Sequence, residues 1–246
     1  MDLSPEQQAF KDEYIRARGY WVPFNDGLLA YSPEWLAAYL AYAGAPARGG
    51  AIDARLRELI YVAVDTSTTH MFAQGLDIHI RAALAVGCTA GELIEVMQIA
   101  TMQGLDSVSA GMAILADEAG ALGIALPHHH IRDELLDRYE SVFGDRPDWL
   151  AAVARVTPDY AVALVDLLVT ADRHGQLSVR DRALIRLALA ASPTHLDRDA
   201  MRVEVRRALA ADATPEQVAT VFQLVAHLGI HACVDGVPMI VAAAGA

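Results

Sequence analysis

The sequence predicts an all-α protein made of two tandem copies of one helical unit, which together form a bundle with pseudo-two-fold symmetry. Nearly every segment has the period of a helix, and no strand pattern is convincing. Residues 51–115 align with residues 176–240 without a gap at a constant offset of 125, and the 65 aligned pairs contain 17 identities. A repeat this long is a whole domain, since solenoid units recur every ~20–50 residues. We therefore expect one domain at 1–122 and a second at 123–246.

Matching signals mark the helix starts in both halves. Each is a capping residue followed by proline, or by glutamate or glutamine three positions later. The chain carries these signals at Ser4-Pro5, Ser32-Pro33, Thr89-x-x-Glu92, Thr157-Pro158 and Thr214-x-x-Gln217.

Each half then reads as a fixed series of helices. A tyrosine-bearing helix comes first, a loop with a Thr-His pair lies in the middle, and an apolar helix ends the half. The helices expected between these landmarks are 33–43, 54–66, 76–86 and 90–103, and in the second half 158–171, 179–191, 201–211 and 215–228. Residues 121–130, with three consecutive histidines, are the expected linker.

Composition excludes several classes of protein. Nineteen basic residues against 31 acidic ones give a net charge of −12, which disfavours nucleic acid and anionic membrane surfaces as partners. Lys11 is the single lysine, so Schiff-base chemistry is not expected. Cys88 and Cys233 form no CxxC pair, and we expect a reduced, cytoplasmic setting. The apolar stretch 218–246 is interrupted by polar residues and reads as a buried helix, not a membrane span.

The most specific stretch runs from Arg57 to Val96 and has the pattern R-x-L-I…H-x-R-A-A-L-x-x-G-x-T-x-x-E-x-x-E-V. It resembles the carboxymuconolactone decarboxylase family, within the superfamily that includes alkylhydroperoxidase D, and both repeats match it. The resemblance implies an alkylhydroperoxidase D-like all-α fold, oligomeric assembly and a site in the bundle near a subunit boundary. The chain has no CxxC pair, since the nearest positions hold His70 and Ala73, so dithiol redox chemistry is excluded.

His79 matches the family's histidine ahead of the Ala-Leu helix, while the second repeat has Glu204 there. Loss of carbon dioxide requires a proton at carbon and stabilisation of negative charge, which two histidines can supply. His70 is the second candidate. On one continuous helix it would lie opposite His79, so a shared pocket requires a break, for which Gly75 is suited. The alternative is that either imidazole is a hydrogen-bonded structural group.

His227 and His231 are spaced i, i+4 and would project from one helix face. His231 is predicted as a catalytic residue that donates a proton or contacts substrate, and His227 as substrate-binding. With His79 they would also offer three metal ligands, which is the metalloenzyme alternative. Glu95 is a candidate catalytic partner for His79, and its alternative is a solvated carboxylate.

Three further residues are predicted to bind substrate: Arg81, Thr69 and Gln98. Arg81 recurs as Arg206, and matched arginines suit a substrate carboxylate. The alternative for Arg81 is an ion pair with Glu58 or Asp77. Recurrence in both halves also fits a structural role.

The sequence therefore predicts an acid–base enzyme that needs no cofactor or metal. Its expected substrate is a small unsaturated or lactone-type carboxylic acid, with decarboxylation as the first expectation. A metalloenzyme and a non-catalytic helical binding or assembly module stay open. The expected partners are the small-molecule substrate and further copies of the chain.

Overall fold

A computed structural model describes residues 3–245, and within this range every regular element is a helix. The predicted all-α class is therefore confirmed. The elements in chain order are α1 (Pro5–Arg18), α2 (Phe24–Tyr31), α3 (Pro33–Gly49), α4 (Ala54–Thr66), α5 (Ala73–Ala85), α6 (Ala90–Thr101), the 3-10 helix η1 (Met102–Leu105), α7 (Asp106–Ala121), α8 (Asp133–Phe143), α9 (Asp148–Val156), α10 (Pro158–His174), α11 (Val179–Ala191), α12 (Arg198–Ala210), α13 (Pro215–Ala226), the 3-10 helix η2 (His227–Ile230) and α14 (His231–Ala244).

The repeat is visible in the helix bounds. The pairs α4/α11, α5/α12 and α6/α13 begin and end 125 residues apart, as do η1 and η2. Even an unfavourable backbone conformation recurs. Met71 and Leu196, in the turns after α4 and α11, have φ of 53° and 50°, in the left-handed region that side chains disfavour. The two halves therefore share one fold in detail. The division into domains at 122/123 stays a prediction, and this point lies in the connection between α7 and α8.

Most helix starts follow the sequence signals. The capping boxes at Ser4, Thr89 and Thr214 are formed. Pro33 and Pro158 open α3 and α10 as expected, but the side chains of Ser32 and Thr157 form no capping hydrogen bond there. The expected starts of α5 and α12, at 76 and 201, were three residues late. Asp197 explains the second of these shifts, because its carboxylate accepts from the backbone N–H groups of Asp199 and Ala200 and caps α12 earlier.

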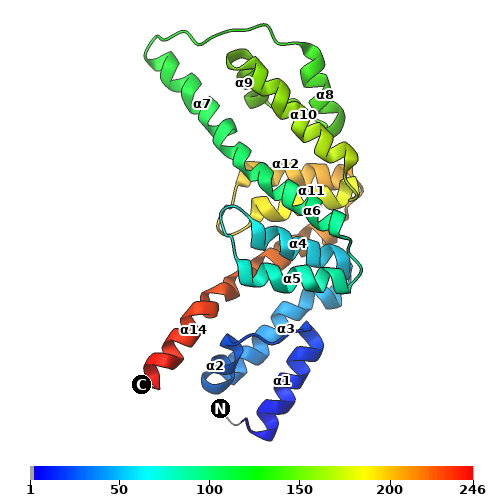
Figure 1. Ribbon diagram of the computed structural model, residues 1–246, viewed down its shortest axis with the longest axis vertical. Coiled ribbons are helices and arrows are strands. Elements are labelled where there is room, and N and C mark those ends of the chain that lie inside the picture. The colour runs from blue at the N-terminus through cyan, green and yellow to red at the C-terminus, as the bar shows by residue number, and fades with distance from the viewer. Residues whose placement is uncertain (1–2, 246) are drawn as a thin grey trace.

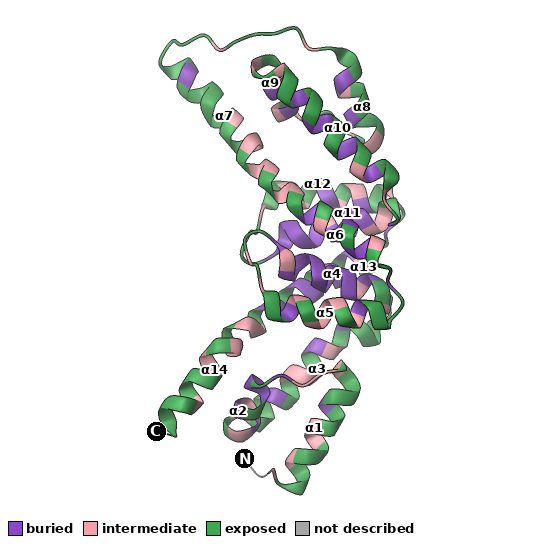
Figure 2. Cartoon of the chain, viewed as in Figure 1, coloured by how far each residue is buried: buried purple, intermediate pink, exposed green. Residues whose placement is uncertain are grey.

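The helices form three regions along one long axis (Figure 1). The middle region is the main core, where α4 and α11 pack together and contact α13 and α6 of the opposite repeats. Figure 2 shows that burial concentrates there. At one end α1, α2 and α3 lie beside α14, and at the other end α8, α9 and α10 lie beside α7. Each half thus contributes its last helix to the other half's N-terminal helices, and this exchange carries second-repeat residues to the first repeat's site.

Two continuous helical segments, Ala90–Ala121 and Pro215–Ala244, are long and apolar enough to cross a membrane by length and composition alone. Their first parts, α6 and α13, bury Val96, Ile99, Val221 and Leu224 in the main core. The apolar character of these parts is therefore accounted for by packing within the protein.

Candidate active site

A buried pair of side chains joins two packed helices of the first repeat. Glu58 lies on α4 and His79 on α5. The Nδ1–H of His79 donates to Oε2 of Glu58 at 2.9 Å, and the side chains are 12% exposed for His79 and 11% for Glu58. A carboxylate at one ring nitrogen orients the imidazole and fixes its tautomer. Nε2 is then the nitrogen available for proton transfer.

The environment of Glu58 favours its ionised form. Burial alone would raise the pKa of this carboxyl, but the hydrogen bond and charge of His79 outweigh burial and lower the pKa below its usual range. Arg57 adds to this effect from 3.4 Å. An ionised Glu58 stabilises His79 when the imidazole carries a proton. The pair can therefore hold a proton and release it to a bound molecule.

Aromatic side chains enclose the imidazole. Tyr61 stacks on the ring of His79 with centroids 4.5 Å apart, and Tyr20 meets it edge-on at 6.1 Å. Arg18 donates to the hydroxyl of Tyr20 at 2.9 Å. Burial raises the pKa of Tyr61 to about 12, so this phenol keeps its proton near neutral pH.

A cavity of about 50 Å³ lies beside His79. Its walls come from α1, α2, α3 and α5 of the first repeat and from η2 and α14 of the second. Burial raises the pKa values of Tyr14 and Tyr39, so the cavity presents neutral phenols that can donate hydrogen bonds. The lining residues are Tyr14, Tyr20, Val22, Phe24, Tyr39, Phe72, Gln74, Gly75, Ile78, His79, Ile230, His231 and Val234.

His231 and His70 meet at the edge of this cavity. Nε2 of His70 and Nδ1 of His231 are 2.8 Å apart, and the ring of Phe72 lies 4.1 Å from that of His231. Burial lowers the pKa of His231 to about 4 and also lowers the pKa of His70. Asp65 lies behind them, and its Oδ2 has no hydrogen-bond partner among the described residues. Burial raises its pKa to about 7.

His227 is separated from His231, contrary to the expectation of one shared helix face. Residues 227–230 form η2, in which each residue turns about 120° instead of 100°. Nδ1 of His227 lies 2.7 Å from the hydroxyl of Tyr61. Burial, followed by the charge of Arg18, lowers the pKa of His227 to about 4, so the ring is neutral. Its role is therefore to hold the aromatic ring that stacks on His79.

The pseudo-two-fold axis passes close to the site. Thr69 and its repeat counterpart Thr194 approach each other, with their Oγ1 atoms 3.1 Å apart. The counterpart of the His70–His231 contact is the pair His195–Asp106, with Nε2 3.0 Å from Oδ2. The same architecture thus carries different chemistry in the two halves.

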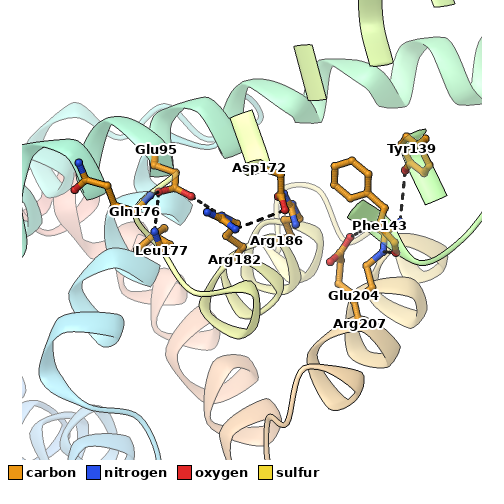
Figure 3. Close-up of polar contacts among 10 residues, drawn as sticks. All are labelled: Glu95, Tyr139, Phe143, Asp172, Gln176, Leu177, Arg182, Arg186, Glu204 and Arg207. Carbon is orange, nitrogen blue, oxygen red and sulfur yellow. Dashed lines mark hydrogen bonds and ion pairs between the residues drawn. The ribbon is translucent and has the colours of Figure 1, made fainter. Parts of the chain in front are cut away.

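A larger cavity of about 390 Å³ occupies the corresponding place in the second repeat. Figure 3 shows a line of buried charges along it. Glu95 binds Nε of Arg182 at 2.5 Å and accepts from the backbone N–H of Leu177 at 2.9 Å. Asp172 follows, 3.6 Å from Arg182 and paired with Arg186. These charges fix α6 and α10 against α11.

Glu204 takes the position of His79 in this second cavity. Its Oε1 accepts from Arg207 at 2.7 Å, while Oε2 has no partner among the described residues. Burial raises the pKa of Glu204, against the lowering effect of Arg207. Arg207 also lies 3.5 Å from the hydroxyl of Tyr139 (Figure 3). This cavity is therefore held by arginine–carboxylate pairs instead of a histidine pair.

Comparison with known proteins agrees with this architecture. Residues 33–117 match the sequence model of the carboxymuconolactone decarboxylase family. A crystal structure from Burkholderia xenovorans LB400, described as a "putative gamma-carboxymuconolactone decarboxylase subunit", superposes with a TM-score of 0.92 at 28% identity over 99% of both chains. The first half of the chain is therefore similar in sequence to the carboxymuconolactone decarboxylase family, and the whole chain is similar in fold to this neighbour. The comparison with curated proteins finds no match. These similarities support a decarboxylase-like or alkylhydroperoxidase D-like activity in coarse terms.

The first-repeat site gathers some of the residues predicted from sequence. His79 and His231 line one cavity, His70 contacts His231, and His227 reaches the site through Tyr61. Thr69 contacts Ser67 and Thr194 at the pseudo-two-fold axis.

Three predicted residues lie elsewhere. Arg81 forms an ion pair with Asp77 at 2.9 Å, and 76% of its side chain is exposed. An ion pair with Asp77 was one of the alternatives expected for Arg81. Glu95 and Gln98 line the second cavity, because α6 packs against α11. The expected pairing of Glu95 with His79 was therefore wrong. The expected helix break at Gly75 was also wrong, because the turn of residues 67–72 separates His70 from His79 and Gly75 lies inside α5.

Sequence reasoning missed three functional candidates: Glu58, Tyr61 and Arg18. Glu58 carried a usable signal, because a glutamate inside the apolar run of α4 must find a buried partner. Tyr61, one turn later on the same helix, lies on the same face as Glu58. Arg18 gave no signal of its own, since a basic residue near a helix end is ordinary.

Proposed function

We propose that this protein is an acid–base enzyme that decarboxylates a small unsaturated or lactone-type carboxylic acid at the first-repeat site. The observation that carries the proposal is the buried Glu58–His79 pair beside a cavity lined by tyrosine hydroxyls and His231. The similarity of residues 33–117 to the carboxymuconolactone decarboxylase family supports the reaction class.

The chemistry assigns one task to each group. The bond between the substrate carbon and its carboxylate breaks, and the electron pair moves into the adjacent unsaturated carbonyl. Nε2–H of His79 then protonates carbon, so that one proton replaces the carbon dioxide that leaves. Glu58 keeps the imidazole oriented until transfer. Tyrosine hydroxyls such as those of Tyr20 and Tyr39, together with His231, donate to the oxygen on which negative charge develops.

The direct test uses purified protein and γ-carboxymuconolactone as substrate. We expect release of one molecule of carbon dioxide per molecule of substrate consumed. Gas analysis measures the carbon dioxide, and the loss of absorbance measures the substrate. The same acid with its ring double bond reduced is the control, because it cannot delocalise the electron pair. If the enzyme at high concentration releases no carbon dioxide from γ-carboxymuconolactone, this substrate class is rejected.

Substrate entry requires the site to open. About 50 Å³ is room for only a few water molecules, whereas small-molecule sites usually span ~300–1,000 Å³. Helix α14 supplies part of the cavity wall and has no fully buried residue. Such weakly packed elements open at low free-energy cost. Movement of α14 away from α2 is therefore the proposed route of entry.

A disulfide between α2 and α14 tests this route. A Cβ at Gly27 would lie 3.9 Å from Cβ of Val237, within the usual range for a disulfide. In a Cys233→Ala background, oxidised Gly27→Cys/Val237→Cys protein is expected to lose turnover by at least ~10-fold and to regain it with reductant. The single variant Val237→Cys, treated alike, is the control. Full activity in the oxidised double variant would exclude the movement.

We also propose that copies of the chain associate through α7 and α14. Both helices expose large apolar side chains, including Ile114 at 62% and Ile240 at 66% exposure. Exposed apolar surfaces of this kind mark interaction sites. Light scattering after size exclusion is expected to show an oligomer for the wild type and smaller species for Ile114→Asp/Ile240→Asp. A wild-type monomer at micromolar concentration would contradict the proposal.

A further inference from the structure

We propose that Asp65, His70 and His231 form a binding site for one divalent transition-metal ion. One carboxylate oxygen and two imidazole nitrogens, one from each residue, all lie within 4.8 Å of one another. This is not the set considered from sequence. His79, His227 and His231 do not form such a cluster among the described residues, since His227 turns toward Tyr61.

The fold fixes the three donors from three separate segments. Asp65 is in the last turn of α4, His70 is in the turn that follows, and His231 opens α14 of the other repeat. The turn is rigid: the backbone N–H groups of His70 and Met71 both bind the carbonyl of Ser67 at 2.9 Å. Met71 holds a φ of 53°, which Leu196 repeats in the second half, so the shape of this turn belongs to the shared fold.

Asp65 supplies an independent sign of a ligand. The residue is 2% exposed, and its Oδ2 lacks any hydrogen-bond partner among the described residues. A buried carboxyl oxygen without a partner is costly, and a coordinated cation would remove this cost. Gly75 keeps the space beside it open, because a Cβ there would lie 2.4 Å from Oδ2.

The donor set selects the class of metal. Two imidazoles and one carboxylate suit zinc, iron or cobalt, whereas magnesium and calcium prefer oxygen ligands only. Three protein ligands leave coordination positions for water or another small ligand. His231 also lines the cavity beside His79. The ion would therefore belong to the wall of that cavity.

The second repeat provides a natural comparison. The counterparts of Asp65 and His231 are Ala190 and Asp106, so only His195 repeats a proposed ligand. His195 and Asp106 do form a cluster with Asp197, but the side chain of Asp106 is 43% exposed and Asp197 already caps α12. The buried carboxyl oxygen without a partner is a feature of the first-repeat cluster.

Binding of Co²⁺ to chelator-treated full-length protein tests the proposal. We expect one ion per chain by equilibrium dialysis and elemental analysis, with the visible absorption typical of cobalt bound by nitrogen and oxygen ligands. Asp65→Asn, His70→Ala and His231→Ala are each expected to weaken binding by at least ~10-fold. Gly75→Ala should weaken it as well, by crowding Oδ2 of Asp65 while leaving all three ligands in the chain.

Two control variants separate this site from other histidines. The triple change of His128, His129 and His130 to alanine removes the exposed run in the linker, and His195→Ala removes the second cluster. Both should keep the stoichiometry and spectrum. Loss of binding in either control, unchanged binding in Asp65→Asn, or no binding by the wild type would overturn the proposal. His79→Ala should keep the ion even without turnover, so this test is independent of the proposed reaction.

Discussion

Replacement of His79 by alanine is expected to lower kcat for decarboxylation by about 10²–10⁴-fold, the usual contribution of a positioned general acid or base. In the proposed reaction the imidazole is the group whose proton reaches the substrate carbon, and Glu58 holds it at 2.9 Å. Steady-state carbon dioxide release measures the effect. His174→Ala, an exposed histidine at the end of α10, is the matched control and should retain full activity.

Glu58→Gln separates orientation from proton transfer. The amide keeps the shape of the side chain but no longer stabilises a charged imidazole, so kcat should fall by about 10²-fold or more while KM changes little. Combined with His79→Ala, it should add almost nothing, because residues that act as one unit are not additive. Additive losses would mean that Glu58 and His79 act separately. Wild-type rates in His79→Ala would remove the imidazole from the mechanism.

The fold was largely predictable because it is encoded by local and repeated signals. The offset of 125 residues relates α4 to α11 and α6 to α13 with the same bounds. Capping boxes at Thr89 and Thr214 set the starts of α6 and α13 as expected. Signals of this kind act within one turn of chain, so a single sequence contains them fully.

The site was only partly predictable because it depends on which helices meet. His79 could be found from its motif, but its partner Glu58 lies on the preceding helix, and spacing along the chain does not give distances across a helix pair. The exchange of α7 and α14 between halves brings His231 to the first-repeat site. This contact is not predicted when each repeat is treated as a self-contained unit. Glu95 on α6 likewise meets Arg182 of the other repeat, because α6 packs against α11 in the main core.

Replacement of Arg182 by alanine is expected to cause the largest loss of stability, about 3–5 kcal/mol in the free energy of unfolding. The change leaves the buried Glu95 without a cation and removes one of the two arginines beside Asp172. Glu95 is bound at 2.5 Å and Asp172 lies at 3.6 Å, and all three side chains are less than 10% exposed. Urea unfolding followed by circular dichroism measures the effect. The midpoint of thermal unfolding should fall by on the order of 10 °C in a chain of this size.

A matched control and a compensating variant sharpen this test. Arg202→Ala removes an exposed ion pair with Asp199 on the same face of α12, and should leave the midpoint unchanged because solvent screens such pairs. Arg182→Met with Glu95→Leu removes both charges of the closest pair and leaves Asp172 with its partner Arg186, and apolar replacement of a buried pair is often neutral. Recovery of stability in this double variant would show that the loss in Arg182→Ala comes from unpaired charge. If the double variant is as unstable as Arg182→Ala, the loss comes from packing between α6 and α11 instead.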